Sequence, residues 1–296
     1  MAQGESRVTH LFCFGLGYSA RVLSARLLEQ GWHITGTSTT ADGAHRITVL
    51  GERARGLVFD GVTASAEVGE ALQSATHMLT SIPPDKIGDP ALRLHRADLA
   101  RASDLSWIGY LSTIGVYGDW QGAWIDEETP PRPQSPRSIQ RLDAENTWLD
   151  FGAETGKRVQ VFRLPGIYGP GRSAIDNVRA GKARRIIKPG QVFNRIHVFD
   201  IATALMAAMS TASHHAIYNL TDDEPAPNQD VVQLAAELLG APVPPDEPFE
   251  SAGLSLMAGS FYSESKRVRN RRMKDDLGVT LAFPTYREGL RQIASR

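Results

Sequence analysis

The sequence predicts an α/β fold, in which a doubly wound parallel sheet carries a smaller, discontinuous C-terminal lobe. Three observations predict it. Short apolar runs alternate with helical patterns in the first half of the chain, a glycine-rich turn joins the first run to the first helix, and proline and glycine interrupt the pattern after Leu164. Strands that alternate with helices form βαβ units, whose right-handed crossovers place helices on both faces of a parallel sheet.

The apolar runs of the first half have the length of strands. We expect strands at Thr9–Phe14, His33–Thr37, Leu57–Phe59, His77–Ser81, Trp107–Ser112 and Val159–Leu164. Between them the apolar spacing predicts helices at Ala20–Gln30, Ala66–Ser74, Ala91–Ala102 and Ile139–Phe151. This alternation is typical of a parallel sheet that is buried on both faces.

The later part of the chain has a different pattern. We expect strands at Gln191–Val198 and Ala216–Leu220, and helices at Asp200–Met209 and Asn228–Leu239. Asn228 is the expected N-cap of the last helix, and Gly240 takes the position just after its end. We expect residues 1–164 to form the main sheet domain, to which residues 191–220 return. Residues 165–190 and 221–296 are expected to form the smaller substrate lobe.

The composition excludes several classes of protein. Of 296 residues, 32 are basic and 33 acidic, so the net charge of −1 provides no field that would gather nucleic acid or an anionic membrane. A single cysteine, Cys13, excludes a disulfide framework, and its apolar neighbours predict a buried thiol. We expect no metal site, because no histidines or cysteines stand at ligand spacing.

No targeting or membrane segment is expected. The N-terminus lacks the features of a signal peptide, and no apolar run approaches the roughly 18 residues that a membrane helix needs. The sequence therefore predicts a cytoplasmic protein without a nucleic-acid or membrane partner.

The turn after the first strand has the pattern G-x-G-x-x-A. It consists of Gly15, Leu16, Gly17, Tyr18, Ser19 and Ala20, and it leads directly into an amphipathic helix. The first glycine permits a tight turn, the second lets a pyrophosphate approach the backbone, and the alanine lets the helix pack on the sheet. Amides at the helix N-terminus then face the anion. The pattern predicts a dinucleotide cofactor in a Rossmann-type domain.

The end of the second strand favours NADP over NAD. An NAD site usually has an acidic residue there, but Thr37 and Ser38 occupy the strand end. These hydroxyls, with Arg46 nearby, would accommodate a 2′-phosphate. Asp42 would restore an NAD site if it reached the ribose. Asp60, after the third strand, is a candidate for the adenine edge, and the alternative is a turn-forming aspartate.

Further motifs follow the glycine turn in a fixed order. They are Tyr110–Gly118, Phe162–Arg172, Arg195–Ala202, Tyr218–Leu220 and Ser265–Arg267. With the turn, they resemble the extended short-chain dehydrogenase/reductase superfamily and its NAD-dependent epimerase/dehydratase group, over nearly the whole chain. The resemblance implies a nicotinamide cofactor, with Pro165 beside it, and a homodimer.

In that family a Ser or Thr, a Tyr and a Lys share the chemistry, and the resemblance assigns Thr113 to the first role. The Tyr and Lys positions hold Arg137 and Arg141 instead. An arginine is only a donor and stays protonated, so it cannot act as the base. Arg141 would still provide positive charge, and Arg137 would bind an anionic substrate or a developing oxyanion. The resemblance therefore implies an atypical member.

Another group would then have to move the proton. Tyr117 and Tyr168 lie in segments expected at the carboxyl edge of the sheet, and the imidazole of His197 titrates near neutrality. Packing or cofactor contact is the alternative for the tyrosines, and a structural hydrogen bond is the alternative for the histidine. Tyr168, His197 and Arg172 are also the expected substrate-binding residues.

Two functions remain open at this point. The first is an NAD(P)-dependent epimerase, dehydratase or reductase that acts on a small polar molecule such as a nucleotide-linked sugar. The second is a sensor or regulatory protein that binds the dinucleotide without catalysis, and the replaced tyrosine favours it.

Overall fold

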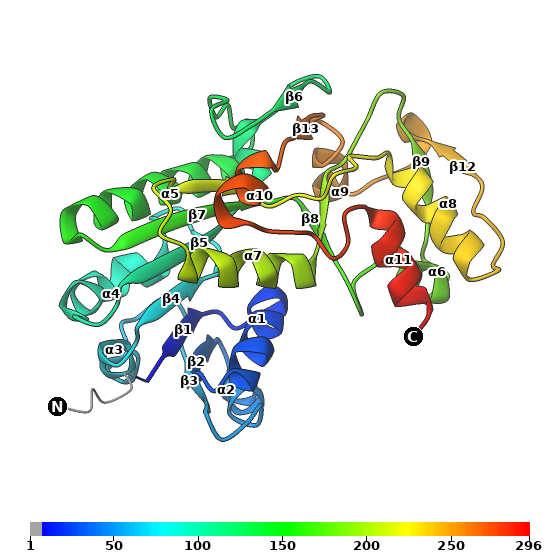
Figure 1. The fold of residues 1–296 in the computed structure, drawn as a ribbon. Helices are drawn as coiled ribbons and strands as arrows, with labels where there is room; N and C mark the ends of the chain where they lie inside the picture. Colours follow the sequence, from blue (N-terminus) through cyan, green and yellow to red (C-terminus); the bar gives the residue numbers. More distant parts are fainter. Residues whose placement is uncertain (1–7) are drawn as a thin grey trace. The chain divides into compact units, whose positions relative to one another are not determined.

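The structure is a computed structural model that describes residues 8–296 (Figure 1). Residues 1–7, on which the expectation of no signal peptide rests, lie outside the described residues. The contacts within the chain define two compact units. The first comprises the chain up to Ser112, Gln140–Phe162 and Ala208–Ala216, and the second comprises Thr113–Ile139, Arg163–Ala207 and Ile217–Arg296.

The main sheet has seven strands in the order β11-β7-β5-β4-β1-β2-β3. Their bounds are β1 His10–Phe14, β2 His33–Ser38, β3 Ala54–Val58, β4 His77–Thr80, β5 Trp107–Thr113, β7 Arg158–Leu164 and β11 Ile217–Asn219. The pairs β1–β2, β1–β4, β2–β3 and β4–β5 are parallel. The chain winds outward from β1 in both directions, which confirms the predicted doubly wound parallel sheet.

Helices of the first unit cover both faces of this sheet. They are α1 Tyr18–Glu29, α2 Ala41–Thr48, α3 Ala66–Gln73, α4 Pro90–Arg101 and α5 Pro136–Thr155. Figure 1 shows α1 and α2 on one face and α3 and α4 on the other. The sequence did not predict α2. This helix has only eight residues, and it follows a run of serine and threonine that is typical of a loop. Thr40 starts this helix by accepting a hydrogen bond from the Gly43 amide.

The core of the first unit is built on β1. Its Leu11, Phe12, Cys13 and Phe14 side chains are completely buried, as is Trp107 on β5. The predicted buried thiol is confirmed, and burial raises the pKa of Cys13 to about 12, so the thiol stays protonated at neutral pH.

The second unit contains short strand pairs and helices. The strand pairs are β6 Trp124–Ile125 with β13 Arg267–Val268, β8 Gly166–Tyr168 with β10 Arg195–His197, and β9 Arg185–Ile187 with β12 Asp246–Pro248. The helices are α6 Ala174–Arg179, α7 Val198–Ser210, α8 Asn228–Leu238, α9 Leu256–Ser260, α10 Arg271–Leu277 and α11 Tyr286–Ala294, with 3₁₀ turns η1 Ile114–Tyr117 and η2 Phe249–Ser251. Tyr168, Ile175, Val231, Tyr286 and Leu290 belong to one apolar cluster that joins α6, α8 and α11.

Three expectations for the later part of the chain differ from the structure. The strand expected at Gln191–Val198 is only the three-residue β10, which pairs with β8, because Val198 already starts α7. Residues 113–139 and 191–207 group with the second unit by contact, not with the main sheet. Pro227, not Asn228, is the N-cap of α8, and the Asn228 side-chain oxygen accepts from Arg195 instead. Gly240 does follow the end of α8, with a φ of +60°.

Within residues 8–296, no helix is both long and apolar enough to cross a membrane. The same part of the chain contains no group of three or more histidine, cysteine, aspartate or glutamate side chains that could hold a metal ion.

Candidate functional site

The turn between β1 and α1 is built around Gly15. Its φ is +77°, a conformation that favours glycine, and an added Cβ would lie 2.6 Å from the Ile82 side chain. The Gly15 amide donates to Thr37 Oγ1 at 2.8 Å, and its carbonyl accepts from the Ser81 hydroxyl. The turn is therefore tied to the ends of the two strands beside β1.

The start of α1 lacks the groups that usually cap a helix. Gly17 is the N-cap, so no side chain accepts from the first turn, and no acidic residue follows in that turn. A Cβ on Gly17 would have no atom within 4 Å, which shows open space above the helix N-terminus. Amides and helix dipole make such an end attractive to an anion. The residues present therefore fit the pyrophosphate of a dinucleotide.

The remaining residues of the turn fix α1 on the sheet. Leu16 is buried, and a Cβ on Gly36 would lie 2.5 Å from its Cδ1. Ser19 and Ala20 are buried against the sheet, while Tyr18 is half-buried. Of the six predicted turn residues, Gly15, Leu16 and Ala20 shape the turn, and Gly17 leaves the space for a ligand.

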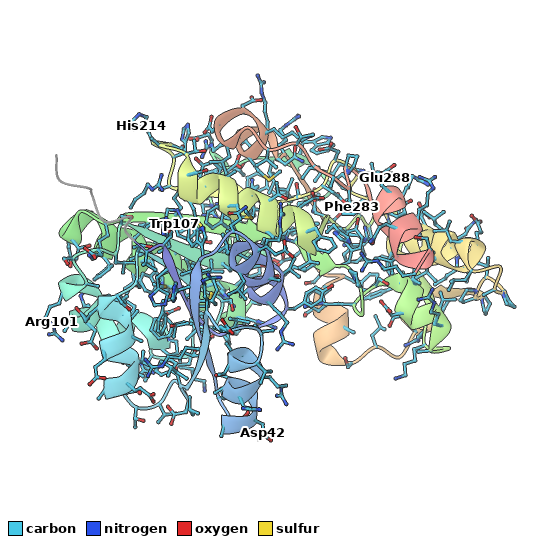
Figure 2. All side chains as sticks on the ribbon, turned by 60° about the horizontal axis from the view of Figure 1, so that its bottom comes forward. Asp42, Arg101, Trp107, His214, Phe283 and Glu288 are labelled. Atoms are coloured by element: carbon cyan, nitrogen blue, oxygen red, sulfur yellow. The ribbon has the colours of Figure 1, made fainter. Side chains whose placement is uncertain are left out.

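The residues expected to select NADP have different environments. Thr37 is buried and its hydroxyl is used by Gly15, and the Ser38 hydroxyl packs against Gly43. Arg46 is exposed in the last turn of α2, and Asp42 is exposed in the first turn of the same helix (Figure 2). Both charged candidates, the Arg46 guanidinium and the Asp42 carboxylate, are therefore accessible to solvent and ligands.

Asp60 shapes the turn that follows β3. Its Oδ1 accepts from the amides of Val62 and Thr63, at 2.8 and 3.1 Å. These bonds to the backbone lower the pKa of the Asp60 carboxyl. The side chain is exposed, so the turn-forming role does not prevent contact with a ligand.

The two arginines of α5 differ in burial. Arg141 is half-buried, and its Nη1 donates to the Leu111 carbonyl at 2.9 Å and to the Tyr110 hydroxyl at 3.1 Å. The same atom lies 3.5 Å from the Ile82 carbonyl. Arg141 is thus fixed where β4 and β5 end, the edge at which such sheets bind ligands. Arg137, one turn earlier on α5, is exposed.

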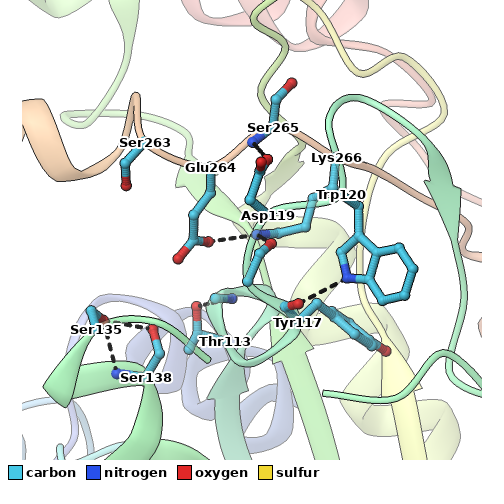
Figure 3. A network of polar contacts seen from close by, with 12 residues as sticks. Thr113, Tyr117, Asp119, Trp120, Ser135, Ser138, Ser263, Glu264, Ser265 and Lys266 are labelled. Atoms are coloured by element: carbon cyan, nitrogen blue, oxygen red, sulfur yellow. Dashed lines mark hydrogen bonds and ion pairs between the residues drawn. The ribbon is translucent and has the colours of Figure 1, made fainter. Parts of the chain in front are cut away.

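In the second unit, Thr113 begins η1. Its Oγ1 accepts from the Gly115 amide at 3.1 Å (Figure 3). A Cβ on Gly115 would lie 3.3 Å from Thr113 Oγ1 and 3.0 Å from Ser138 Oγ, so the two hydroxyls border the same small space. Sequence reasoning missed Ser138; its place between the two arginines of the motif was the available signal.

The three candidates for proton transfer have different partners. Tyr117 is completely buried, and its hydroxyl donates to Asn219 Oδ1 at 2.9 Å. Burial also raises its pKa. The Tyr168 hydroxyl donates to the Thr285 carbonyl at 3.3 Å, and burial raises its pKa as well. These contacts support packing roles for both tyrosines.

His197 lies in an aromatic cluster. Its ring packs against Tyr168, Phe199 and Phe283, with a centroid distance of 4.0 Å to Phe283. Burial lowers the pKa of His197 to about 4, so the imidazole is neutral at physiological pH. Its Nδ1 accepts from the Phe199 amide at 3.3 Å, which supports a structural role.

Two predicted residues lie on the segment around β8. Pro165 is half-buried between β7 and β8. Arg172 is exposed, in a tight turn where its backbone and that of Gly169 exchange hydrogen bonds. Both positions are accessible to a ligand.

A cavity of about 270 Å³ lies within the second unit, among α6, α8 and α11. It is lined by Tyr168, Ala174, Asn177, Lys182, Ala183, Arg184, Ile186, Arg195, Asn228, Val231, Val232, Tyr286 and Leu290. Three of these described residues are cationic and none is acidic. Arg195 is held in the wall by the carbonyls of Phe193 and Ala226, each at 2.9 Å. Arg184 is ion-paired with Glu247, so Lys182 and Arg195 are the lining residues that would meet an anionic ligand with an apolar part.

Sequence reasoning found Tyr168 but not the cationic residues of this cavity. Lys182 and Arg184 lie in an irregular stretch, and Arg195 begins the Arg195–Ala202 motif, whose residue types give no local sign of a cavity. Their convergence depends on the packing of helices that are distant in the sequence.

The parallel sheet and the open glycine turn define a dinucleotide-binding α/β protein. The profile of the NAD dependent epimerase/dehydratase family matches residues 15–221, and the chain belongs to this family.

The chain is similar to three known proteins in sequence or in structure. The solved structure of a conserved protein of unknown function from Silicibacter pomeroyi matches this chain with a TM-score of 0.87, over 97% of this chain and 99% of that one. The two sequences are 47% identical. Protein YeeZ of Escherichia coli K12 is 29% identical over 91% of this chain and 94% of its own. UDP-glucuronic acid 4-epimerase from Bacillus cereus, solved with UDP-glucuronic acid and NAD, shares the fold at 17% identity, with a TM-score of 0.76 over 97% and 99% of the two chains.

Replacing His197 by phenylalanine is expected to reduce the loss of stability in acid. The folded imidazole takes up its proton near pH 4 and the unfolded one near 6.5, so its stabilising effect is complete above pH 6.5 and is lost as the pH falls toward 4. The shift corresponds to about 3 kcal/mol. Thermal unfolding of the wild type and the variant between pH 4 and 7 measures this difference in acid stability.

The matched control is the exposed His214, whose replacement by phenylalanine should leave the pH profile unchanged. His77, whose pKa is also lowered to about 4 by burial, retains its own contribution in both variants. Equal profiles for the wild type and His197→Phe would show that folding does not lower the pKa of His197.

Proposed function

We propose that the protein is an NAD(P)-dependent enzyme that acts on a nucleotide-linked sugar by an epimerase, dehydratase or reductase reaction. The observation that carries the proposal is the uncapped glycine turn at the start of α1, with open space at Gly17. When bound, the nicotinamide ring would accept or donate a hydride. Gly15–Ala20 would hold the pyrophosphate, and the exposed Arg46 would bind a 2′-phosphate.

The cavity of the second unit supports the substrate class. Its cationic wall of Lys182, Arg184 and Arg195 suits a phosphate group, and its volume suits a fragment such as a phosphorylated sugar. The hydroxyls of Thr113 and Ser138 would orient the reacting oxygen of the sugar, since both border one space. The B. cereus relative, which binds a UDP-sugar and NAD, supports the same class.

A second candidate function is a dinucleotide sensor without catalysis. The packed environments of Tyr117, Tyr168 and His197 favour it, because none of these groups has the accessible ionisable form that proton transfer needs. Binding of the dinucleotide without turnover of any sugar nucleotide would support this alternative.

Gly17→Val is expected to weaken dinucleotide binding without unfolding the protein. A Cβ at this position meets no atom within 4 Å, so the side chain is accommodated by the fold but fills the space proposed for the pyrophosphate. We expect the Kd for NADPH and NADH to rise at least tenfold, about 1.4 kcal/mol, in a fluorescence titration. Gly51→Val, also in open space, is the control. Unchanged binding in Gly17→Val would refute the cofactor site.

Arg46→Ala tests the proposed preference for NADP. Loss of a charge-assisted contact to the 2′-phosphate should weaken NADPH binding by about tenfold and leave NADH binding unchanged, because NADH lacks that phosphate. The exposed Arg21 on α1 provides the control variant, Arg21→Ala. An equal effect of Arg46→Ala on both dinucleotides would contradict the preference.

Lys182→Ala tests the substrate pocket. With a panel of UDP-, GDP- and dTDP-linked hexoses, calorimetry should show binding of at least one compound to the wild type. The variant should bind it about tenfold more weakly, because the phosphate loses a cation. Dinucleotide affinity should not change, and turnover is followed by nicotinamide absorbance. If no compound binds, the proposed substrate class is wrong; if compounds bind without turnover, the sensor is favoured.

A further inference from the structure

A buried ion pair lies on the segment that leads into β13. Lys266 is 5% exposed, and its Nζ donates to the Gly118 carbonyl at 2.5 Å and to Glu264 Oε2 at 2.6 Å. Burial lowers the pKa of Lys266, while Glu264 and Asp119 act in the opposite direction. The Glu264 side chain is 17% exposed, so its carboxylate is paired and still accessible to a small molecule.

This segment is fixed to the loop that begins at Thr113. The Ser265 amide donates to Asp119 Oδ1 at 2.7 Å, and its carbonyl accepts from the amides of Trp120 and Gly122. Lys266 reaches the same loop at Gly118, where η1 ends. A 3₁₀ turn rises about 2 Å per residue, so Thr113 and Gly118 are separated by only about 10 Å along it.

Gly118 makes this attachment possible. Its φ is +68°, and an added Cβ would lie 2.0 Å from the Arg132 carbonyl, so no other residue fits there. In this conformation the carbonyl of Gly118 accepts the hydrogen bond from Lys266. The position of Glu264 relative to Thr113 is therefore set by backbone contacts on both sides of the pair.

The carboxylate of Glu264 points toward three hydroxyl groups. Figure 3 shows it directed toward Thr113, Ser135 and Ser138, with Lys266 on its other side. The Ser135 hydroxyl donates to Ser138 Oγ at 2.9 Å, and Ser138 shares the space beside Gly115 with Thr113. A carboxylate thus faces the group that is proposed to orient the reacting oxygen.

A carboxylate can do what the arginines of α5 cannot. It accepts hydrogen bonds and protons, whereas a guanidinium only donates. A buried ion pair contributes little to stability compared with apolar residues of the same size, so stability alone does not account for this one.

We propose that Glu264 is the proton acceptor for the substrate hydroxyl bound by Thr113, with Lys266 as the residue that positions its carboxylate. The inference rests on the proposed function. In the oxidative direction the substrate O–H bond breaks and its proton passes to Glu264, while a C=O bond forms. The hydrogen of the adjacent C–H bond leaves with its electron pair to the oxidised dinucleotide. In reduction the protonated Glu264 returns the proton.

The test uses the full-length protein and the sugar nucleotide found to turn over in the panel. We expect Glu264→Gln to lower kcat by 10²- to 10⁴-fold, because the amide cannot take the proton. If Glu264 is the proton acceptor, kcat of the wild type should fall as the medium is acidified, and this acid limb should disappear in the variant. Formate should partly rescue Glu264→Ala by supplying a small carboxylate.

A binding measurement gives a readout that does not depend on turnover. Calorimetry of Glu264→Gln should show weaker affinity for the sugar nucleotide and unchanged affinity for the nucleoside diphosphate alone, since only the sugar carries the hydroxyl. Lys266→Met should lower kcat more than it raises KM, because the Glu264 carboxylate loses the ammonium group that positions it. Glu250→Gln, exposed in the same unit, is the control.

The outcomes separate this inference from the proposed function. A wild type that turns over while folded Glu264→Gln retains its rate and acid limb overturns the role of Glu264 and leaves the enzyme intact. A wild type that binds dinucleotide and sugar nucleotide without turnover overturns both. Loss of activity without formate rescue, and with the acid limb retained, would show that Glu264 is structural.

Discussion

The tight turn at Gly15 is the constraint on which the first unit's ligand site depends. Its amide and carbonyl are held by Thr37 at the end of β2 and by Ser81 just after β4, the two strands beside β1. The close approach of Ile82 leaves no room for a side chain. Because the turn cannot relax, α1 begins at a fixed point with its first amides open. The proposed anion site would thus be formed by the backbone, which agrees with a chain of net charge −1.

Side chains, in contrast, build the chemistry of the second unit. Lys182, Arg184 and Arg195 give one cavity a cationic wall, and Glu264 and Lys266 form a neutral pair beside the loop of Thr113. Although the net charge of the chain is near zero, positive and negative side chains gather at different places in this unit. What a ligand meets depends on where charges gather, since the interaction of two charges falls with distance and with screening by solvent.

The sequence predicted the elements whose signal is local. The six strands of the first half and the glycine turn follow from apolar spacing and from the special φ that glycine allows, and all lie within two or three residues of their expected bounds. The sequence did not predict elements that are very short or that depend on residues far away in the chain. The paired strands β6 and β13 have only two residues each, too few to show a periodic pattern. Asn228 has the residue type of an N-cap, but its side-chain oxygen accepts from Arg195 on β10.

By itself, the sequence determined the doubly wound sheet, the glycine turn after β1 and the presence of arginine at positions 137 and 141. Only the tertiary structure decided which hydroxyls and charges meet. It buried Tyr117 against Asn219 and placed Ser138 beside Thr113. It also brought Glu264 to the same loop, because the neighbouring Ser265 and Lys266 donate to Asp119 and Gly118. The physical reason is the sequence separation of these partners. Ser138 follows Thr113 by a loop and the start of a helix, and the other contacts join residues more than 100 positions apart. Such contacts leave no periodic trace in either segment, because they exist only when both segments pack against the same core.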